Sequence, residues 1–231
     1  MLTIRPANDR GHVRFEWLDT WHSFSFGHYY DPKHMGFRAL RVINDDTVAG
    51  GGGFDEHPHK DMEIITVILQ GELAHKDSMG NVETIKTGEV QRMSAGTGVF
   101  HSEFNASEVD PVHLLQIWLL PDRKNIEPGY EQKAFDFSQH GLVRVASASG
   151  RDGAVTMHQD AELLRGTVLA DKSLEYKLAE GRHAWVQVIE GPLVVNGVTL
   201  KAGDGLAVSD ERSLSITAPG GKGDFLLFDL A

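Results

Sequence analysis

Short apolar runs bounded by turn-forming residues constrain the fold of this 231-residue chain more than any other feature. Gly, Asp, Asn and Pro separate runs rich in Val, Ile, Leu and aromatic residues, at 38–44, 64–69, 112–120, 184–189, 193–195 and 225–230. Runs of this length at close spacing are typical of an all-β sandwich or barrel. The 25 glycines suit tight turns, which need residues that tolerate positive φ. We predict a mainly β fold, with 159–164 as the best helix candidate.

The chain also divides into two halves with related patterns. Residues 121–138 interrupt the apolar pattern with charge, proline and glycine, as connecting segments do. The sequence TVILQGEL at 66–73, followed by a turn at Gly88, resembles VQVIEGPL at 186–193, followed by a turn at Gly203. The pattern in each half therefore predicts a strand, a glycine turn, a strand and a second glycine turn. We predict two related β domains, residues 1–125 and 126–231.

The composition limits both the chemistry and the location of the protein. The chain has no cysteine, so a transition-metal site must use nitrogen and oxygen donors. The chain contains no run of eighteen or more apolar residues, so we predict no membrane span. The first residues do not have the pattern of a signal peptide. We expect a cytoplasmic protein with no membrane partner. The net charge of −11 disfavours nucleic acid as a partner, because an acidic surface repels phosphate.

Two pairs of potential metal ligands stand out. His57 and His59 are two residues apart, so an extended strand projects both imidazoles from the same face. His101 and Glu103 repeat this spacing further along the chain, after a glycine-rich turn. On neighbouring strands the two pairs would surround one point with three imidazoles and one carboxylate, which suits divalent iron, copper, cobalt, nickel, manganese or zinc. We predict one mononuclear metal site, with unrelated surface histidines as the alternative.

The sequence around these pairs resembles a known family. The first cupin motif resembles the pattern Gly51-x5-His57-x-His59-x3-Glu63. A variant of the second cupin motif resembles the segment from Gly88 through His101-x3-Asn105. More narrowly, five segments resemble the pirin family. They are WHSFSFGHYY at 21–30, HPHK at 57–60, GELAH at 71–75, SAGTGVFHSE at 94–103 and QIWL at 116–119. The similarity extends to about residue 137 and continues more weakly to the C-terminus.

The resemblance implies a bicupin, with two tandem jelly-roll barrels of which only the N-terminal one binds metal. We expect Fe²⁺ ahead of the other divalent metals. Cupins often take their carboxylate ligand from the first motif, here Glu63, whereas pirins take it from the second, here Glu103. We therefore expect Glu103 to be the ligand and Glu63 to be a hydrogen-bond partner of the site or a surface residue. His183 has no paired ligand and is expected to be structural.

The remaining histidines and two residues of a later apolar run receive simpler predictions. We expect His22, His28 and His34 to pack or to form hydrogen bonds among aromatic residues. His75 follows a glycine turn and is expected to be exposed or at a pocket rim, and His113 is expected not to touch a substrate. Gln116 and Trp118 share one face of a predicted strand, so one of them is expected to line a pocket.

The resemblance also suggests a reaction. Bacterial pirins are associated with quercetin 2,3-dioxygenase activity, which implies a metal-dependent enzyme that opens a flavonol ring with O2 and releases carbon monoxide. Glu103 would then act as a catalytic base toward the 3-hydroxyl group as well as a ligand. The alternative is a metal-dependent sensor or protein-binding module that acts as a transcriptional co-regulator without turnover. Nothing in the sequence requires an oligomer, so we expect a monomer.

Overall fold

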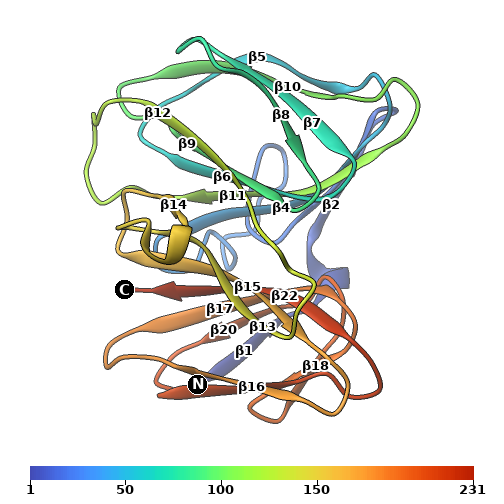
Figure 1. Ribbon diagram of the computed structural model, residues 1–231, viewed down its shortest axis with the longest axis vertical. Coiled ribbons are helices and arrows are strands. Elements are labelled where there is room, and N and C mark those ends of the chain that lie inside the picture. Colours follow the sequence, from blue (N-terminus) through green and yellow to red (C-terminus); the bar gives the residue numbers. More distant parts are fainter. The chain divides into compact units, whose positions relative to one another are not determined.

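The computed structural model describes residues 1–231 and is almost entirely β (Figure 1). The chain forms two compact units. The N-terminal unit comprises Gly11–Phe135 and Val155–Gln159, and the C-terminal unit comprises Met1–Arg10, Asp136–Ala154 and Asp160–Ala231. The change of unit after Phe135 falls within the predicted connecting segment, 121–138. The domain limits 1–125 and 126–231 stay a prediction, and the compact units differ from them at residues 1–10 and 155–159.

Two antiparallel sheets build the N-terminal unit. Their strands are β2 (Gly11–Arg14), β3 (Leu18–His22), β4 (Leu40–Val48), β5 (Gly53–His59), β6 (Glu63–Gln70), β7 (Glu72–Asp77), β8 (Val82–Lys86), β9 (Glu89–Ser94), β10 (Val99–Asn105), β11 (Val112–Leu119) and β12 (Gly129–Ala134), with the short β14 (Val155–Thr156) beside them. One sheet has the order β12-β9-β6-β11-β4-β3-β2 and the other has the order β5-β10-β7-β8. Figure 1 shows these two layers in blue to yellow-green.

The C-terminal unit repeats this plan. Its strands are β1 (Leu2–Arg5), β13 (Gly141–Ser147), β15 (Ala161–Val168), β16 (Ser173–Lys177), β17 (His183–Glu190), β18 (Leu193–Val195), β19 (Val198–Leu200), β20 (Gly205–Val208), β21 (Ser213–Thr217) and β22 (Gly223–Leu230), and its short 3-10 turns are η1 (Ala7–Asp9) and η2 (Arg151–Gly153). The larger sheet contains β1-β20-β17-β22-β15-β13, and the smaller sheet has the order β16-β21-β18-β19. Strand β1, from the start of the chain, pairs with β20.

The six apolar runs all form strands, namely β4, β6, β11, β17, β18 and β22, so the all-β prediction is confirmed. The related halves also fold alike. Gly71 joins β6 to β7 with φ +81°, and Gly191 joins β17 to β18 with φ +76°. A Cβ atom at Gly191 would lie 2.2 Å from the carbonyl oxygen of Lys222, so glycine is required there by space as well as by φ.

The helix predicted at 159–164 is wrong. Strand β15 occupies most of this segment and pairs with β13 on one side and β22 on the other. The sequence Ala-Glu-Leu-Leu-Arg at 161–165 has high helix propensity, but such propensity amounts to less than 1 kcal/mol per residue. Hydrogen bonding to two neighbouring strands and burial of Leu163 and Leu164 override it.

The interior of the C-terminal unit is a single apolar cluster that includes Leu164, Val186, Leu206, Leu214 and Leu227. In the N-terminal unit the apolar cluster around Ile68, Leu73 and Leu114 is smaller, and polar side chains such as Thr66, Gln91 and Gln116 are also buried. The N-terminal unit therefore has a polar interior region, and this is where the predicted metal ligands lie.

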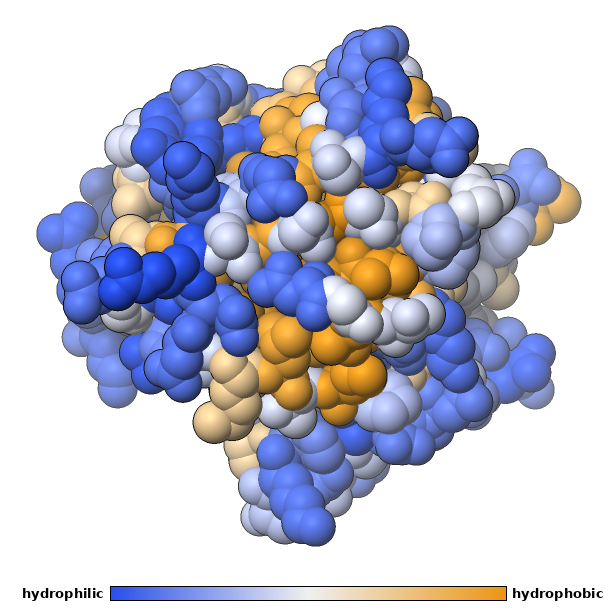
Figure 2. Space-filling model, turned by 90° about the horizontal axis from the view of Figure 1, so that it is seen from below, coloured by the Kyte–Doolittle hydropathy of each residue, from blue (hydrophilic) through white to orange (hydrophobic).

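The molecular surface defines no further site by itself. Figure 2 shows a face on which hydrophobic residues gather in the middle and hydrophilic residues surround them. Apolar atoms contribute about half of the surface of folded proteins in general, so such a patch is ordinary. No helix of the structure is long and apolar enough to cross a membrane.

Candidate metal centre

The two predicted pairs lie on neighbouring strands of the smaller N-terminal sheet. His57 and His59 end β5, His101 and Glu103 lie on β10, and His101 is directly opposite His57 in the register. Pro58, between the two histidines, lacks an N–H to donate. It is tolerated because β5 is the edge strand of its sheet, so one side of its backbone needs no partner.

The three imidazoles converge. Their ring centroids are 4.5 Å apart for His57 and His101, and 4.8 Å apart for the other two pairs. One nitrogen of each histidine lies within 4.8 Å of the others. The Nδ1 atom of His57 lies 2.7 Å from the backbone oxygen of Asp55, which orients the ring and leaves Nε2 available as a donor atom.

Glu103 lies close to His101, in a second group with His75 that does not include His57 or His59. Two further residues, Gln116 and Thr66, fix its orientation. The pairing of β10 with β5 shifts between His101 and Glu103, a β-bulge that changes the direction of the next side chain. Gln116 Nε2 on β11 donates to Glu103 Oε2 at 2.8 Å, and Thr66 Oγ1 on β6 donates to Gln116 Oε1 at 2.9 Å. Gln116 is thereby held in the amide orientation that presents its N–H groups to the carboxylate.

Burial keeps His59 and His101 neutral. Burial lowers the pKa of His59 to about 4, with a smaller contribution from His57. Burial also lowers the pKa of His101 to about 2, and the neighbouring histidines add to the shift. Neutral imidazole is the form that binds metal. Burial raises the pKa of Glu103 to about 7 and the charge of Asp46 adds to the shift, while the hydrogen bond from Gln116 opposes it.

Unpartnered polar atoms show that this group of residues fits a metal ion. His101 is buried with no hydrogen-bond partner for either nitrogen, and Glu103 Oε1 is buried without a partner as well. Buried polar atoms without partners are rare in native proteins and call for an explanation. A divalent cation would satisfy one nitrogen of His101 and Glu103 Oε1, and these nitrogen and oxygen donors suit a transition metal.

His75 differs from its prediction. It is buried, neither exposed nor at a pocket rim, and its ring centroid lies 5.0 Å from that of Tyr130. His75, His101 and Glu103 also group closely enough to hold a cation. However, Gln91 Nε2 donates to His75 Nδ1 at 3.0 Å, and His75 Nε2 lies 3.1 Å from Asp77 Oδ2. Because both of its nitrogens are engaged, His75 is better suited to supporting His101 than to binding metal.

Glu63 is buried and lies away from the cluster. It accepts a hydrogen bond from Ser94 Oγ at 2.9 Å and lies 3.4 Å from His158 Nδ1. The turn between β5 and β6, with Asp61 at φ +50°, breaks the strand alternation that would otherwise relate Glu63 to His59. Within β6, Thr66 points toward Gln116, so Glu63, an odd number of residues away, points to the opposite face.

A small cavity of about 60 Å³ opens at the cluster, and Gln116 and Trp118 both line it, as the shared face predicted. Trp118 packs edge-on against His59, with ring centroids 4.9 Å apart, and against Phe26 at 5.2 Å. These aromatic side chains form an apolar wall beside the imidazoles. Such a wall excludes water from the open side of a metal.

The other histidines mostly form hydrogen bonds. Each of three histidines has a partner at Nδ1. The partner of His22 is Asn44 Oδ1 at 2.7 Å, that of His34 is Asp31 Oδ2 at 2.7 Å, and that of His183 is Ser209 Oγ at 2.9 Å. His113 Nε2 lies 2.7 Å from Asp45 Oδ1, outside the cavity lining. His22 and His28 also line a second cavity, together with Asp46. Asp46 was not predicted from the sequence, because nothing in the strand LRVINDDTV sets it apart from the neighbouring Asn44 and Asp45.

Comparisons with known proteins agree with this geometry. The family model described as "Pirin" matches residues 3–119, and the one described as "Quercetinase C-terminal cupin domain" matches residues 144–230. A protein of Escherichia coli (strain K12) named quercetin 2,3-dioxygenase is 50% identical, over 100% of this chain and 99% of that protein.

Solved structures show the same fold. The bacterial pirin YhhW from Escherichia coli, crystallised in complex with nickel(II), is 49% identical with a TM-score of 0.96, over 100% of this chain and 99% of that one. A quercetin 2,3-dioxygenase from Acinetobacter baumannii is 25% identical with a TM-score of 0.81, over 98% of this chain and 85% of that one.

Two tandem cupin barrels, with a histidine cluster in the first and an apolar interior in the second, define a bicupin. Among the bicupin families, the match to the Pirin model and the 50% identity to a relative over the full chain decide to which family this protein belongs. The chain belongs to the pirin family.

Proposed function

We propose that this protein is a metal-dependent dioxygenase that cleaves a flavonol of the quercetin type. His57, His59, His101 and Glu103 would hold one divalent metal, with Fe²⁺ as the first candidate. The observation that carries the proposal is the convergence of three imidazoles near a buried carboxylate with an unpartnered oxygen. The relatives named quercetin 2,3-dioxygenase support the choice of substrate.

A bound metal would supply Lewis-acid stabilisation of the flavonol anion and electronic coupling to O2. Glu103 would supply the base as well as a ligand, and burial raises the pKa of this carboxyl to about 7 in the metal-free protein. A carboxylate with a pKa near neutrality is well matched to accept the proton of the 3-hydroxyl group. Gln116 donates to Oε2 and so orients the carboxylate that would bind the metal and accept this proton.

In the net reaction both atoms of O2 enter the organic product, the ring opens, and the carbon that carried the 3-hydroxyl leaves as carbon monoxide. Trp118 and Phe26 shield this chemistry from water on one side of the cluster. We further propose that the protein acts in the cytoplasm as a monomer on a small molecule, without binding nucleic acid or a membrane. Its acidic surface supports the absence of nucleic acid.

The test is oxygen uptake by the metal-reconstituted protein with quercetin, beside the Glu103→Ala and Glu63→Ala variants. We expect uptake that requires quercetin and metal, is lost in Glu103→Ala and persists in Glu63→Ala. A Glu63→Ala protein that loses its metal while Glu103→Ala stays fully loaded would refute the ligand assignment. The absence of uptake with iron, copper, cobalt, nickel or manganese loaded would favour the sensor that acts without turnover.

A further inference from the structure

A second and larger cavity adjoins the metal cluster. It has a volume of about 170 Å³ and lies between β3, β4 and the aromatic segment that follows β3. It shares Phe26, Asn44, Asp46 and Phe54 with the small cavity at the cluster, so the two spaces are contiguous. A ligand at the cluster that is longer than one ring can therefore extend along these residues.

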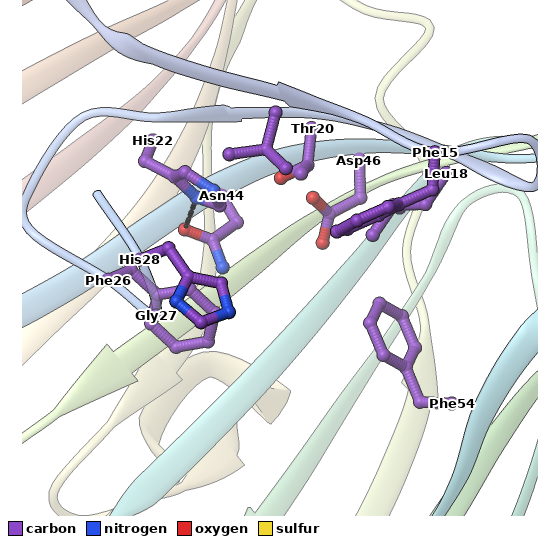
Figure 3. Close-up of a pocket in the computed structure, with 11 residues that line it drawn as sticks. Phe15, Leu18, Thr20, His22, Phe26, Gly27, His28, Asn44, Asp46 and Phe54 are labelled. Atoms are coloured by element: carbon purple, nitrogen blue, oxygen red, sulfur yellow. Dashed lines mark hydrogen bonds between the residues drawn. The ribbon is translucent and has the colours of Figure 1, made fainter.

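Asp46 is the unusual member of this lining. It is 3% exposed, and its Oδ1 atom has no hydrogen-bond partner. Figure 3 shows its carboxylate pointing into the cavity, between Thr20 and the ring of Phe15. Asn44 and Asp46 are two residues apart on β4, so the pleat of the strand directs both side chains into the same space.

A buried carboxylate with an unpartnered oxygen is unfavourable for the folded protein. Burial raises the pKa of Asp46 to about 7 and the charge of Asp45 adds to the shift, while the nearby Thr20 hydroxyl and His113 oppose it. Leaving such a group in place destabilises a protein unless a ligand supplies the missing donor. In contrast, the neighbouring Asp45 accepts from His113 at 2.7 Å, so its carboxylate has a partner within the protein.

The rest of the cavity indicates what kind of ligand brings that donor. Phe15, Phe26 and Phe54 provide aromatic faces, and Phe15 is 53% exposed at the outer side. Asn44 Oδ1 is engaged by His22 at 2.7 Å, which leaves the amide nitrogen of Asn44 as a donor. An apolar space with one acceptor and one donor fits an aromatic ring that carries hydroxyl groups.

We propose that Asp46 accepts a hydrogen bond from a phenolic hydroxyl of the bound substrate, on a ring other than the one that carries the 3-hydroxyl, and so selects polyhydroxylated flavonols. The inference rests on the proposed function for the class of ligand. Asp46 is then a specificity-determining residue, and Glu103 remains the base. A site that presents a buried acceptor discriminates strongly against analogues without the hydroxyl, because the acceptor is left unpaired.

The experiment compares two ligands under anaerobic conditions, so that neither is consumed. Quercetin carries hydroxyls on all its rings, whereas 3-hydroxyflavone keeps only the 3-hydroxyl. Dissociation constants are measured by fluorescence for the metal-reconstituted wild type and for Asp46→Ala, Asp46→Asn and the control Asp45→Ala. We expect Asp46→Ala to weaken quercetin binding about tenfold or more and to leave 3-hydroxyflavone within about twofold. Asp46→Asn, which keeps one acceptor oxygen, should give an intermediate loss, and Asp45→Ala should show no such selectivity.

Equal losses for both ligands in Asp46→Ala, or no loss for quercetin, would overturn the inference. Metal content and melting temperature are measured for each variant, so that a misfolded protein is recognised; Asp46→Asn, which keeps the shape of the side chain, then decides the test. Oxygen uptake by the wild type separates the two proposals. If Asp46 selects quercetin over 3-hydroxyflavone but the wild type takes up no oxygen, the dioxygenase proposal is refuted and the inference about Asp46 is kept. If the wild type takes up oxygen but Asp46→Ala shows no ligand selectivity, the inference is refuted and the dioxygenase proposal is kept. Failure of the wild type to bind either ligand would overturn both.

Discussion

The two units of this protein have the same strand plan and opposite interiors. A row of four side chains crosses the larger sheet of each unit, one from each of four paired strands. In the N-terminal unit the row is Asn44, Gln116, Thr66 and Gln91. At the corresponding places of the C-terminal unit the row is Leu164, Leu227, Val186 and Leu206, all within the apolar cluster. The fold accepts either row, so the polar one has a reason other than folding.

The smaller sheets differ in the same way. The positions of His101 and Glu103 on β10 correspond to Leu214 and Ile216 on β21, two buried residues at the same spacing. His75 on β7 corresponds to Val195 on β18, since both follow the equivalent glycine turn by four residues. The comparison shows that the proposed metal site is a set of side chains placed on a fold that is stable without them.

The largest effect is expected where a proposed metal ligand of the N-terminal unit is replaced by the apolar residue at the corresponding position of the C-terminal unit. In His101→Leu we expect bound metal to fall below about a tenth of an equivalent and oxygen uptake with quercetin to fall at least about a thousandfold, because an imidazole ligand is lost. The metal-free variant should be at least as stable as the metal-free wild type, since two unpartnered nitrogens are removed. Elemental analysis and thermal unfolding measure this, with His113→Leu as the control. A fully loaded His101→Leu protein would contradict the assignment.

The reverse exchange should damage the other unit. Leu227→Gln places an amide among Leu164, Val186 and Leu206, where no partner exists. We expect the free energy of unfolding of the C-terminal unit to fall by about 3 kcal/mol, from lost apolar burial and an unsatisfied amide. Urea denaturation followed by tryptophan fluorescence measures the loss, while metal content stays unchanged. Unaltered stability would show that this interior tolerates polar groups after all.

A smaller effect is expected when the polar row itself is made apolar. Gln116→Leu removes the donor to Glu103 Oε2. We expect metal affinity or kcat with quercetin to fall about 10- to 100-fold, the usual range for residues that orient a metal ligand. Thr66→Val, which removes only the donor to Gln116, should have a weaker effect in the same direction. Competition with a chelator and steady-state kinetics report the two quantities. Wild-type values in Gln116→Leu would make the row a packing feature only.

The smallest effect concerns pH. Burial raises the pKa of Asp46 from 3.8 to about 7, so the folded state holds this proton more tightly than the unfolded state. The wild type should therefore lose stability relative to Asp46→Asn as the pH rises from about 4 to about 7, because the unfolded state releases this proton first. The Asp46 charge also raises the pKa of Glu103, so the double variant Asp46→Asn with Glu103→Gln is compared with Glu103→Gln to isolate the Asp46 proton. Unfolding curves of the metal-free proteins across this range measure it; a difference that does not change with pH would contradict a buried, unpaired carboxylate.

The sequence predicted the parts of this structure that depend on local spacing. Six apolar runs gave six strands, and the spacing of two residues put His57 beside His59 on one strand. The side chains of Gln116 and Trp118 share a cavity for the same reason. These features follow from strand alternation, which is a property of consecutive residues alone.

Features that depend on distant partners were missed. Strand β15 has helix-forming residues and is decided by its neighbours β13 and β22. The burial of His75 depends on Gln91 and Tyr130, which come from other strands. The direction of Glu63 depends on a turn at Asp61 that resets the alternation. Asp46 gave no signal, because its neighbours in the cavity come from separate parts of the chain.

The pairing of β1 with β20 has a consequence for how the chain is made. Residues Leu2–Arg5 are synthesised first, but their partner strand, Gly205–Val208, emerges about 200 residues later. Contacts between segments so distant in sequence slow folding, because a long loop must close before they form. The C-terminal barrel therefore cannot complete its larger sheet during synthesis of the N-terminal barrel. A fragment that begins at residue 126 would leave β20 as an unprotected sheet edge, where such strands promote aggregation.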